Sequence, residues 1–189
     1  GEIIKRRDYI FPSSVRTPQD YFDEAIKEEI VFLNDFLNEI KEEKDFPLVS
    51  LDESFSSYYP FLNTKIHGWI NWSWNAEEID IFICAFDNPY DGASTYLNGV
   101  RVHLKSSKYS ESNETFHPFH SGLVYRCSSN AIYIAVKGGS LIVQKVINDS
   151  GVNIINKIKE GFRFTTPQDK LEHALEFNAL YGPNGLENV

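Results

Sequence analysis

The 189-residue sequence predicts an α+β protein in which a strand and a long helix precede a five-stranded antiparallel, OB-like Greek-key barrel with flanking helices. Three observations support this prediction. An apolar stripe with helical spacing occupies residues 18–43. Five short runs rich in β-branched and aromatic residues follow after residue 92. The pairs Asn98-Gly99 and Gly138-Gly139 separate neighbouring runs and are typical of antiparallel hairpins.

The long helix has a clear start signal. Residues 2–10 alternate weakly and predict a strand with basic residues at an exposed edge. Thr17 can cap the helix, Pro18 suits its first turn, and Asp20 supplies an acid three residues after the cap. The stripe continues at intervals of three or four residues through Phe22, Ile26, Ile30, Leu33, Leu37 and Ile40. It predicts one helix to about residue 43, with a solvated acidic face.

A linker and the barrel elements follow the helix. Residues 46–66 have little periodicity and predict an extended segment. Asn75 then caps a short helix with two glutamates in its first turn, where the helix dipole favours acids. A short helix ended by Gly161 and a capped helix starting at 165–167 follow the barrel. The five strands are expected at about 93–97, 100–107, 121–127, 131–137 and 140–147.

Composition narrows the class of protein. Hydrophobic residues make up 42% of the chain and aromatic residues 14%, which is enough for a packed core. The chain has no apolar run of about 18 residues that could span a membrane, and we expect a cytoplasmic protein. Cys84 and Cys127 lie in apolar surroundings and are predicted to be buried thiols rather than a disulfide.

The net charge of −9 is unevenly distributed. Residues 1–64 carry 7 Lys and Arg against 14 Asp and Glu, residues 65–164 carry 10 against 9, and residues 165–189 carry 1 against 4. Binding a tRNA backbone needs a clustered basic face, because affinity comes mainly from phosphate neutralisation. A near-neutral barrel with acidic flanks therefore argues against tRNA as the partner, although charge segregated on one face would still allow it.

The segment 68–104 carries the most specific pattern in the chain. It holds all three tryptophans within six residues, then a short helix pattern, an Asn-Pro-Tyr-Asp-Gly-Ala turn and two strand-like runs. This order resembles the start of the C-terminal domain of the 10-formyltetrahydrofolate-dependent formyltransferases, the group of methionyl-tRNA formyltransferase and the sugar N-formyltransferases. In that family the segment reads approximately Ile-Asp-Trp, a helix, Arg-Ala-Phe and Pro-Tyr-Pro-Gly-Ala. The sequence departs from it at Asn71 (for an acid), Cys84 (for arginine) and Asp91 (for proline).

The resemblance implies a division of the chain. Residues 1–45 would be the end of a Rossmann-like catalytic formyltransferase domain, 46–66 a linker, 67–164 the OB-like C-terminal domain, and 165–189 a helical extension. The first four residues resemble part of the family's Asp-x-Gly-x-Ile motif, whose catalytic aspartate would precede Gly1. The family's catalytic asparagine and histidine lie further upstream. The resemblance therefore implies that this chain holds no catalytic residue and is inactive alone.

Four residues are candidates for contact with substrate. Tyr58 and Tyr59 precede a proline and resemble a tyrosine-proline segment at the family's active-site rim, where they could stack on the acceptor or instead pack the linker onto the catalytic domain. Asn71 and Trp72 are candidates for a supporting role beside the site. The tryptophans could alternatively stack a nucleic-acid base or anchor the linker by packing, and packing is favoured.

Metal binding is not expected. His117 and His120 have a two-residue gap that suits ligation, but no cysteine or carboxylate pair lies nearby in sequence. The leading hypothesis is the C-terminal part of an enzyme that transfers a formyl group from 10-formyltetrahydrofolate to an amine. An amino-sugar nucleotide or another small metabolite is favoured over Met-tRNA as the acceptor. The alternative is a non-catalytic OB-like module that binds single-stranded nucleic acid or holds a homodimer together.

Overall fold

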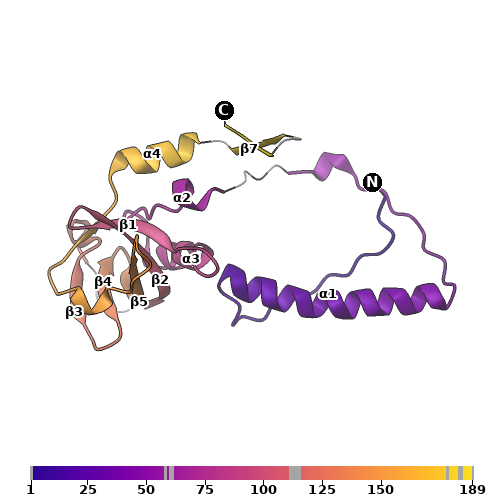
Figure 1. Cartoon of the computed structure of the whole chain (residues 1–189), viewed down its shortest axis with the longest axis horizontal. Coiled ribbons are helices and arrows are strands. Elements are labelled where there is room, and N and C mark those ends of the chain that lie inside the picture. Colours follow the sequence, from indigo (N-terminus) through magenta and orange to yellow (C-terminus); the bar gives the residue numbers. More distant parts are fainter. Residues whose placement is uncertain are drawn as a thin grey trace. The chain divides into compact units, whose positions relative to one another are not determined.

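The computed structural model describes residues 2–57, 59, 62–110, 116–177, 179–182 and 185–188. The chain divides into two compact units, Gly1–Tyr59 and Pro60–Val189. The first unit is dominated by one long helix, and the second holds a curled β-sheet with shorter helices (Figure 1). This composition confirms the predicted α+β class.

Helix α1 of the first unit extends over Pro18–Lys41, close to the predicted range. Its start is the predicted capping box. The Thr17 hydroxyl accepts a hydrogen bond from the Asp20 backbone amide, and the Asp20 carboxylate accepts one from the Thr17 amide. These reciprocal bonds satisfy amides that the first turn would otherwise leave unpaired. The rest of the unit is irregular apart from a 3₁₀ turn at Glu53–Phe55.

The predicted strand at residues 2–10 is wrong. The only β pairing in this segment is one bridge, in which Ile3 and Val49 exchange backbone hydrogen bonds of 2.8 and 3.0 Å. A strand is stabilised by a neighbouring strand, and the described residues offer this segment only that single pair. The described part of this unit shows no Rossmann-like sheet, so its origin in such a domain remains a prediction.

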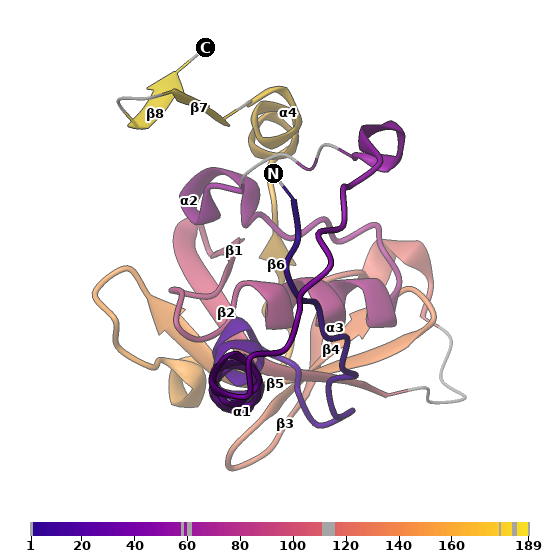
Figure 2. The ribbon, with the colours of Figure 1, turned by 90° about the vertical axis from the view of Figure 1, so that its right-hand side faces the viewer.

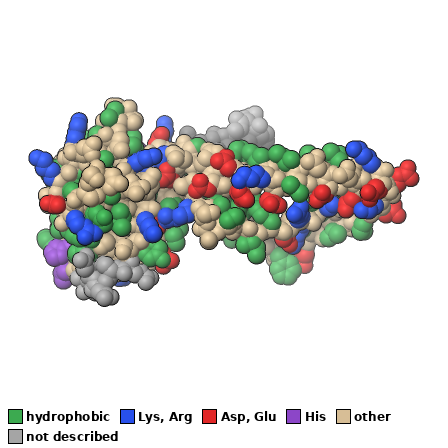
Figure 3. Space-filling model, turned by 90° about the horizontal axis from the view of Figure 1, so that it is seen from below, with side chains coloured by type: hydrophobic (Ala, Val, Ile, Leu, Met, Phe, Trp, Pro, Cys, Tyr) green, Lys and Arg blue, Asp and Glu red, His purple; other side chains and the backbone are tan. Residues whose placement is uncertain are grey.

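The apolar stripe of α1 lies at the surface of the described unit. Phe22 is 60% exposed, Ile30 56% and Leu33 54%, and α1 contains no buried residue. Figure 3 shows hydrophobic side chains at the surface with acidic and basic side chains between them. The periodicity therefore predicted the helix correctly, although the described residues do not bury its apolar side.

The second unit contains a six-stranded antiparallel sheet with strand order β3-β4-β5-β2-β1-β6. The five expected strands are all present, and the predicted count is wrong because a two-residue strand, β6, extends the sheet. Two short helices precede the sheet, α2 at Thr64–His67 and α3 at Ala76–Ala85. The strand bounds are β1 Ala93–Leu97, β2 Val100–Ser110, β3 Val124–Cys127, β4 Ile132–Val136, β5 Gly139–Asn148 and β6 Phe164–Thr165.

The sheet curls so that its first and last strands approach each other (Figure 2). Strand β6 pairs with β1, with Phe164 opposite Leu97. On its other side, Phe164 donates a backbone hydrogen bond to Gly122, and Val124 donates one to Phe162, at 2.9 and 2.8 Å. A short bridge between residues 122–124 and 161–164 thus joins the two edges. The two-residue length of β6 explains why periodicity could not find it.

Both glycine-containing hairpins form, one of them in a shifted register. Asn98 and Gly99 have φ of +52° and +79°, as a type I′ turn requires. In the second hairpin Val136 pairs with Gly139, so the two-residue loop is Lys137-Gly138 and Gly139 is the first residue of β5. The expected Gly138-Gly139 turn is therefore displaced by one residue.

The core lies between the concave face of the sheet and helix α3. Asn75 caps α3, accepting a hydrogen bond from the Glu78 amide while the Glu78 carboxylate accepts one from the Asn75 amide. The helix buries Ile79 and Ile83 completely, and both belong to the cluster that strand residues complete. Neither Cys84 nor Cys127 forms a disulfide, as predicted; Cys84 is buried, whereas Cys127 is only half-buried.

Two elements follow the sheet. Helix α4 covers Gln168–Glu176, but Pro167 occupies its N-cap position and no side chain caps it, so the predicted cap is absent. A hairpin of β7, Ala179–Gly182, and β8, Gly185–Asn188, lies beyond α4. Short 3₁₀ turns occur at Pro118–His120 and Ile155–Lys157, the latter where a short helix was expected. Among the residues that the structure describes, no helix has the length and hydrophobicity to cross a bilayer.

Candidate functional site

The predicted rim tyrosines lie where the two units meet in sequence. Tyr59 is 84% exposed, and among the described residues its hydroxyl has no hydrogen-bond partner. Tyr58 lies outside the described residues. A role for this pair at a substrate therefore remains a prediction.

Asn71 and Trp72 form the turn that leads into α3. The Asn71 side-chain oxygen accepts hydrogen bonds from the Ser73 amide at 3.0 Å and the Ser73 hydroxyl at 2.7 Å, which fixes the turn. Trp72 is 8% exposed, its Nε1 donates to the Thr95 hydroxyl at 3.0 Å, and its ring stacks on Phe164. Trp72 therefore joins the turn before α3 to β1 and β6, while Asn71 fixes the turn itself. A supporting role of either residue beside a substrate remains a prediction.

A polar cleft of about 490 Å³ lies elsewhere on the second unit, and the sequence reading did not identify it. Its walls come from α2, the loop before β1, strand β2 and the turn after β5. The lining residues are Lys65, Asp91, Arg101, His103, Ile147, Asn148, Asp149, Ser150 and Gly151. Side chains of both charge signs therefore face one small space.

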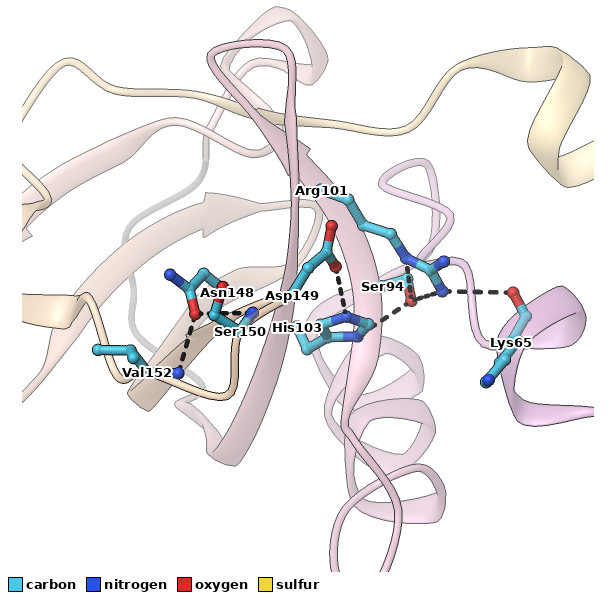
Figure 4. Close-up of polar contacts among 8 residues, drawn as sticks. All are labelled: Lys65, Ser94, Arg101, His103, Asn148, Asp149, Ser150 and Val152. Carbon is cyan, nitrogen blue, oxygen red and sulfur yellow. Dashed lines mark hydrogen bonds and ion pairs between the residues drawn. The ribbon is translucent and has the colours of Figure 1, made fainter.

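His103 lines the cleft and is 8% exposed. Figure 4 shows its ring between Asp149 and Ser94. Its Nε2 lies 3.2 Å from Asp149 Oδ1, and its Nδ1 lies 3.3 Å from Ser94 Oγ. A chain of serine, histidine and aspartate suggests nucleophilic catalysis, but Ser94 is only 1% exposed. Its hydroxyl also accepts hydrogen bonds from Arg101, so this oxygen is saturated and inaccessible. The arrangement is a buried hydrogen-bond network rather than a nucleophile with its base.

Arg101 is fixed in position on the same strand. Its guanidinium lies 4.6 Å from the Trp69 ring centroid, and Nη2 donates to Ser94 Oγ at 2.8 Å and to the Lys65 carbonyl at 3.3 Å. Stacking and these hydrogen bonds hold the planar group in one orientation. Figure 4 shows the guanidinium between Ser94 and the Lys65 carbonyl. Arg101 thus presents a positive charge to the cleft at little further entropic cost.

The remaining charges of the cleft belong to Lys65, Asp91 and Asp149. The side chains of Lys65 and Asp91 are exposed. Among the described residues, neither the Lys65 ammonium nor the Asp91 carboxylate has a hydrogen-bond or ion-pair partner. They line the same cleft without pairing with each other. As far as the described residues show, the cleft therefore offers one cation and one anion that are not engaged within the fold.

Part of this site was accessible from the sequence. A type I′ turn at Asn98-Gly99 fixes the β1–β2 register, which places Ser94 opposite His103. The alternation Arg101, His103, Lys105 also puts these side chains on one face of β2. His103 was not among the candidates named from the sequence, although both signals were present. Asp149 and Lys65 carried no such signal, because they reach the cleft through tertiary contacts.

His117 and His120 are the histidine pair whose spacing in sequence suits metal ligation. The rings of His117 and His120 are 6.3 Å apart between centroids, and both residues sit at an exposed 3₁₀ turn. Within the described residues, no group of three or more His, Cys, Asp or Glu is arranged to hold a metal ion.

The fold and the comparisons with known proteins together define the class. The family "Formyl transferase, C-terminal domain" matches residues 63–158, from the start of α2 to the end of the 3₁₀ turn at Ile155–Lys157. This range covers half of the chain, and the chain belongs to this family. The predicted recognition from the tryptophan-rich segment is confirmed.

Solved structures of HypX from Aquifex aeolicus share the fold. One HypX variant aligns with a TM-score of 0.54 at 18% identity, covering 74% of this chain and 24% of HypX. A second HypX variant aligns with a TM-score of 0.52 at 17% identity, covering 74% of this chain and 23% of HypX. The chain thus spans about a quarter of the length of HypX. A third HypX structure, in complex with tetrahydrofolic acid, aligns with a TM-score of 0.44 at 20% identity, covering 59% and 18%. The comparison with curated proteins finds no match.

Proposed function

We propose that the chain is the accessory, C-terminal part of a formyltransferase that passes a formyl group from 10-formyltetrahydrofolate to an amine. The family match over residues 63–158 supports this proposal. In the enzymes that the sequence resembles, a histidine and an aspartate polarise the formyl carbonyl and relay protons, while an asparagine stabilises the oxyanion. We assign those three residues to sequence upstream of Gly1, so the present chain contributes the domain that accompanies the reaction centre.

The proposed contribution to substrate binding comes from the linker and the start of the OB-like domain. Tyr58 and Tyr59 would contact the acceptor, and the exposed ring of Tyr59 is compatible with such a contact. Asn71 and Trp72 would act by holding the turn before α3, as their hydrogen bonds suggest. We therefore expect changes at the tyrosines to affect acceptor KM, and changes at Trp72 to affect stability first.

The proposed acceptor is a small amine, such as an amino-sugar nucleotide, rather than aminoacyl-tRNA. The charge distribution supports this choice, because residues 65–164 carry 10 Lys and Arg against 9 Asp and Glu. Three of these basic residues are also engaged within the domain. Lys105 contacts Asn88 and the Tyr90 carbonyl, Arg126 stacks on Tyr133, and Arg163 contacts the Phe119 carbonyl. A tRNA backbone would need such charges free on one face.

The test compares the chain alone with the polypeptide extended upstream by its own coding sequence. Release of tetrahydrofolate is measured with 10-formyltetrahydrofolate and either an amino-sugar nucleotide or Met-tRNA as acceptor. We expect no turnover by the chain alone, and turnover by the extended polypeptide with the amino-sugar nucleotide. Formyl transfer by residues 1–189 would overturn the assignment of the catalytic residues, and a preference for Met-tRNA would overturn the acceptor class.

The alternative, a non-catalytic module, finds one supporting observation. The apolar stripe of α1 is exposed in its own unit, as expected of a surface that assembles with a second copy. A monodisperse dimer together with an inactive extended polypeptide would favour a homodimerisation module. Salt-dependent binding of single-stranded oligonucleotides would instead favour an OB-like nucleic-acid module.

A further inference from the structure

The polar cleft has two features that a purely structural network would not need. The first is the open volume of about 490 Å³, which is large enough for a small metabolite. The second is the unpaired state, among the described residues, of the Lys65 ammonium and the Asp91 carboxylate. Opposite charges on one cleft that do not pair with each other are available to a ligand.

One side of the cleft is suited to an anionic group. Arg101 is already oriented by Trp69 and Ser94, so binding would not have to order its side chain. Its Nη1 donates no hydrogen bond among the described residues. Lys65 lines the same cleft, and its backbone carbonyl accepts a hydrogen bond from the Arg101 guanidinium. An arginine and a lysine on one cleft can bind a phosphate or carboxylate through charge-assisted hydrogen bonds.

The other charges of the cleft disfavour a simple polyanion. Asp91 is exposed and without a partner among the described residues, and Asp149, 63% exposed, contacts only His103 through its carboxylate. Two carboxylates facing the same space repel added negative charge and attract an ammonium. Lys65 and Arg101 bring two positive charges to the cleft, and Asp91 and Asp149 bring two negative charges. The chemistry of the walls therefore matches a ligand that carries both signs.

We propose that this cleft binds a small zwitterionic metabolite that carries a phosphate or carboxylate and a primary ammonium. The anionic group lies against Lys65 and Arg101, and the ammonium lies against Asp91 and Asp149. The inference concerns binding alone and rests on neither the formyl donor nor the acceptor of the proposed reaction.

The experiment titrates the whole chain with O-phosphoethanolamine, followed by calorimetry and by backbone amide NMR shifts. Inorganic phosphate and ethanolamine, the two halves of the probe, are the matched ligands. K65Q and D91N are the test variants, because both side chains are exposed and neither substitution breaks a contact among the described residues. K145Q, an exposed lysine of β5 outside the cleft, is the control.

We expect saturable binding of O-phosphoethanolamine, with amide shifts centred on Arg101, His103 and residues 148–151. Loss of one charge partner should weaken binding about tenfold in K65Q and in D91N, while K145Q stays within about twofold. Each half-ligand should bind at least about fivefold more weakly than the whole probe. The proposal fails if the probe does not saturate, if inorganic phosphate binds equally well, or if K65Q and D91N bind like the unchanged chain. These binding outcomes are independent of the turnover assay, so either proposal can fail without the other.

Discussion

Replacing Gly122 with alanine tests how the sheet of the second unit closes. Gly122 has φ of +80° and lies where the two sheet edges meet. Its amide donates to the Ala135 carbonyl and its carbonyl accepts from the Phe164 amide, both at 2.9 Å. An added Cβ would lie 2.2 Å from the Phe164 carbonyl oxygen, so the bridge must open or distort.

The magnitude follows from two separable costs. Placing alanine at positive φ costs about 1–2 kcal/mol, because Cβ crowds the adjacent carbonyl oxygen. The clash with Phe164 adds about 1–3 kcal/mol, as for other overpacked sites. Gly99 is a matched control, because its φ is +79° and nothing lies within 4 Å of a Cβ built there. We therefore expect losses of about 1–2 kcal/mol for G99A and about 2–5 kcal/mol for G122A.

Equilibrium urea unfolding monitored by tryptophan fluorescence measures both values. Trp69, Trp72 and Trp74 all belong to the second unit, so the signal reports on the sheet rather than on α1. The m-value should stay constant across the series, which shows that midpoint shifts reflect stability. If G122A and G99A lose the same stability within about 0.5 kcal/mol, the bridge to Phe164 is not part of the closed sheet and the reasoning fails.

Three further predictions concern local features. In N75A the capping box of α3 is lost, which should cost about 1 kcal/mol in the same urea assay, and an unchanged midpoint would contradict the cap. Hydrogen bonds from the Thr17 backbone and hydroxyl, and from the Arg16 backbone, lower the pKa of Asp20. The ionised carboxylate therefore stabilises α1 at pH values above its ordinary pKa, and this stabilisation is lost as the pH falls through the lowered pKa. Circular dichroism at 222 nm should therefore show a smaller acid-induced loss of helix in D20N than in the unchanged chain, and equal losses would refute the cap's role. Burial, and to a smaller extent the charge of Glu160, raise the pKa of the Cys127 thiol. Alkylation of Cys127 at pH 8, followed by mass spectrometry, should therefore be slower than alkylation of glutathione. It should be faster in E160Q than in the unchanged chain.

Features that depend on neighbouring residues could be read from the sequence. The Thr17 capping box and the cap at Asn75 each join residues three positions apart, and both form as predicted. The Asn98-Gly99 turn fixed the register of β1 and β2, because its positive φ at both positions forms a type I′ turn that joins adjacent antiparallel strands. The tryptophan-rich segment identified the family for the same reason, since its residues lie together in the chain.

Features that depend on distant contacts could not be read in this way. The segment 2–10 has a strand-like pattern, but the described residues provide it with one bridge and no neighbouring strand. Strand β6 has two residues, too few for any periodicity, and it exists because β1 lies on one side of it and residues 122–124 on the other. The polar cleft joins Arg101 to Lys65 across 36 positions and His103 to Asp149 across 46.

The sequence by itself thus determined helices α1, α3 and α4, the main hairpins and the membership of the formyltransferase C-terminal family, because each rests on short-range chemistry. Only the tertiary structure decided the sheet's closure, the burial of Trp72 and the assembly of the charged cleft around His103. Those outcomes depend on which surfaces meet, and backbone hydrogen bonds between remote segments set that choice.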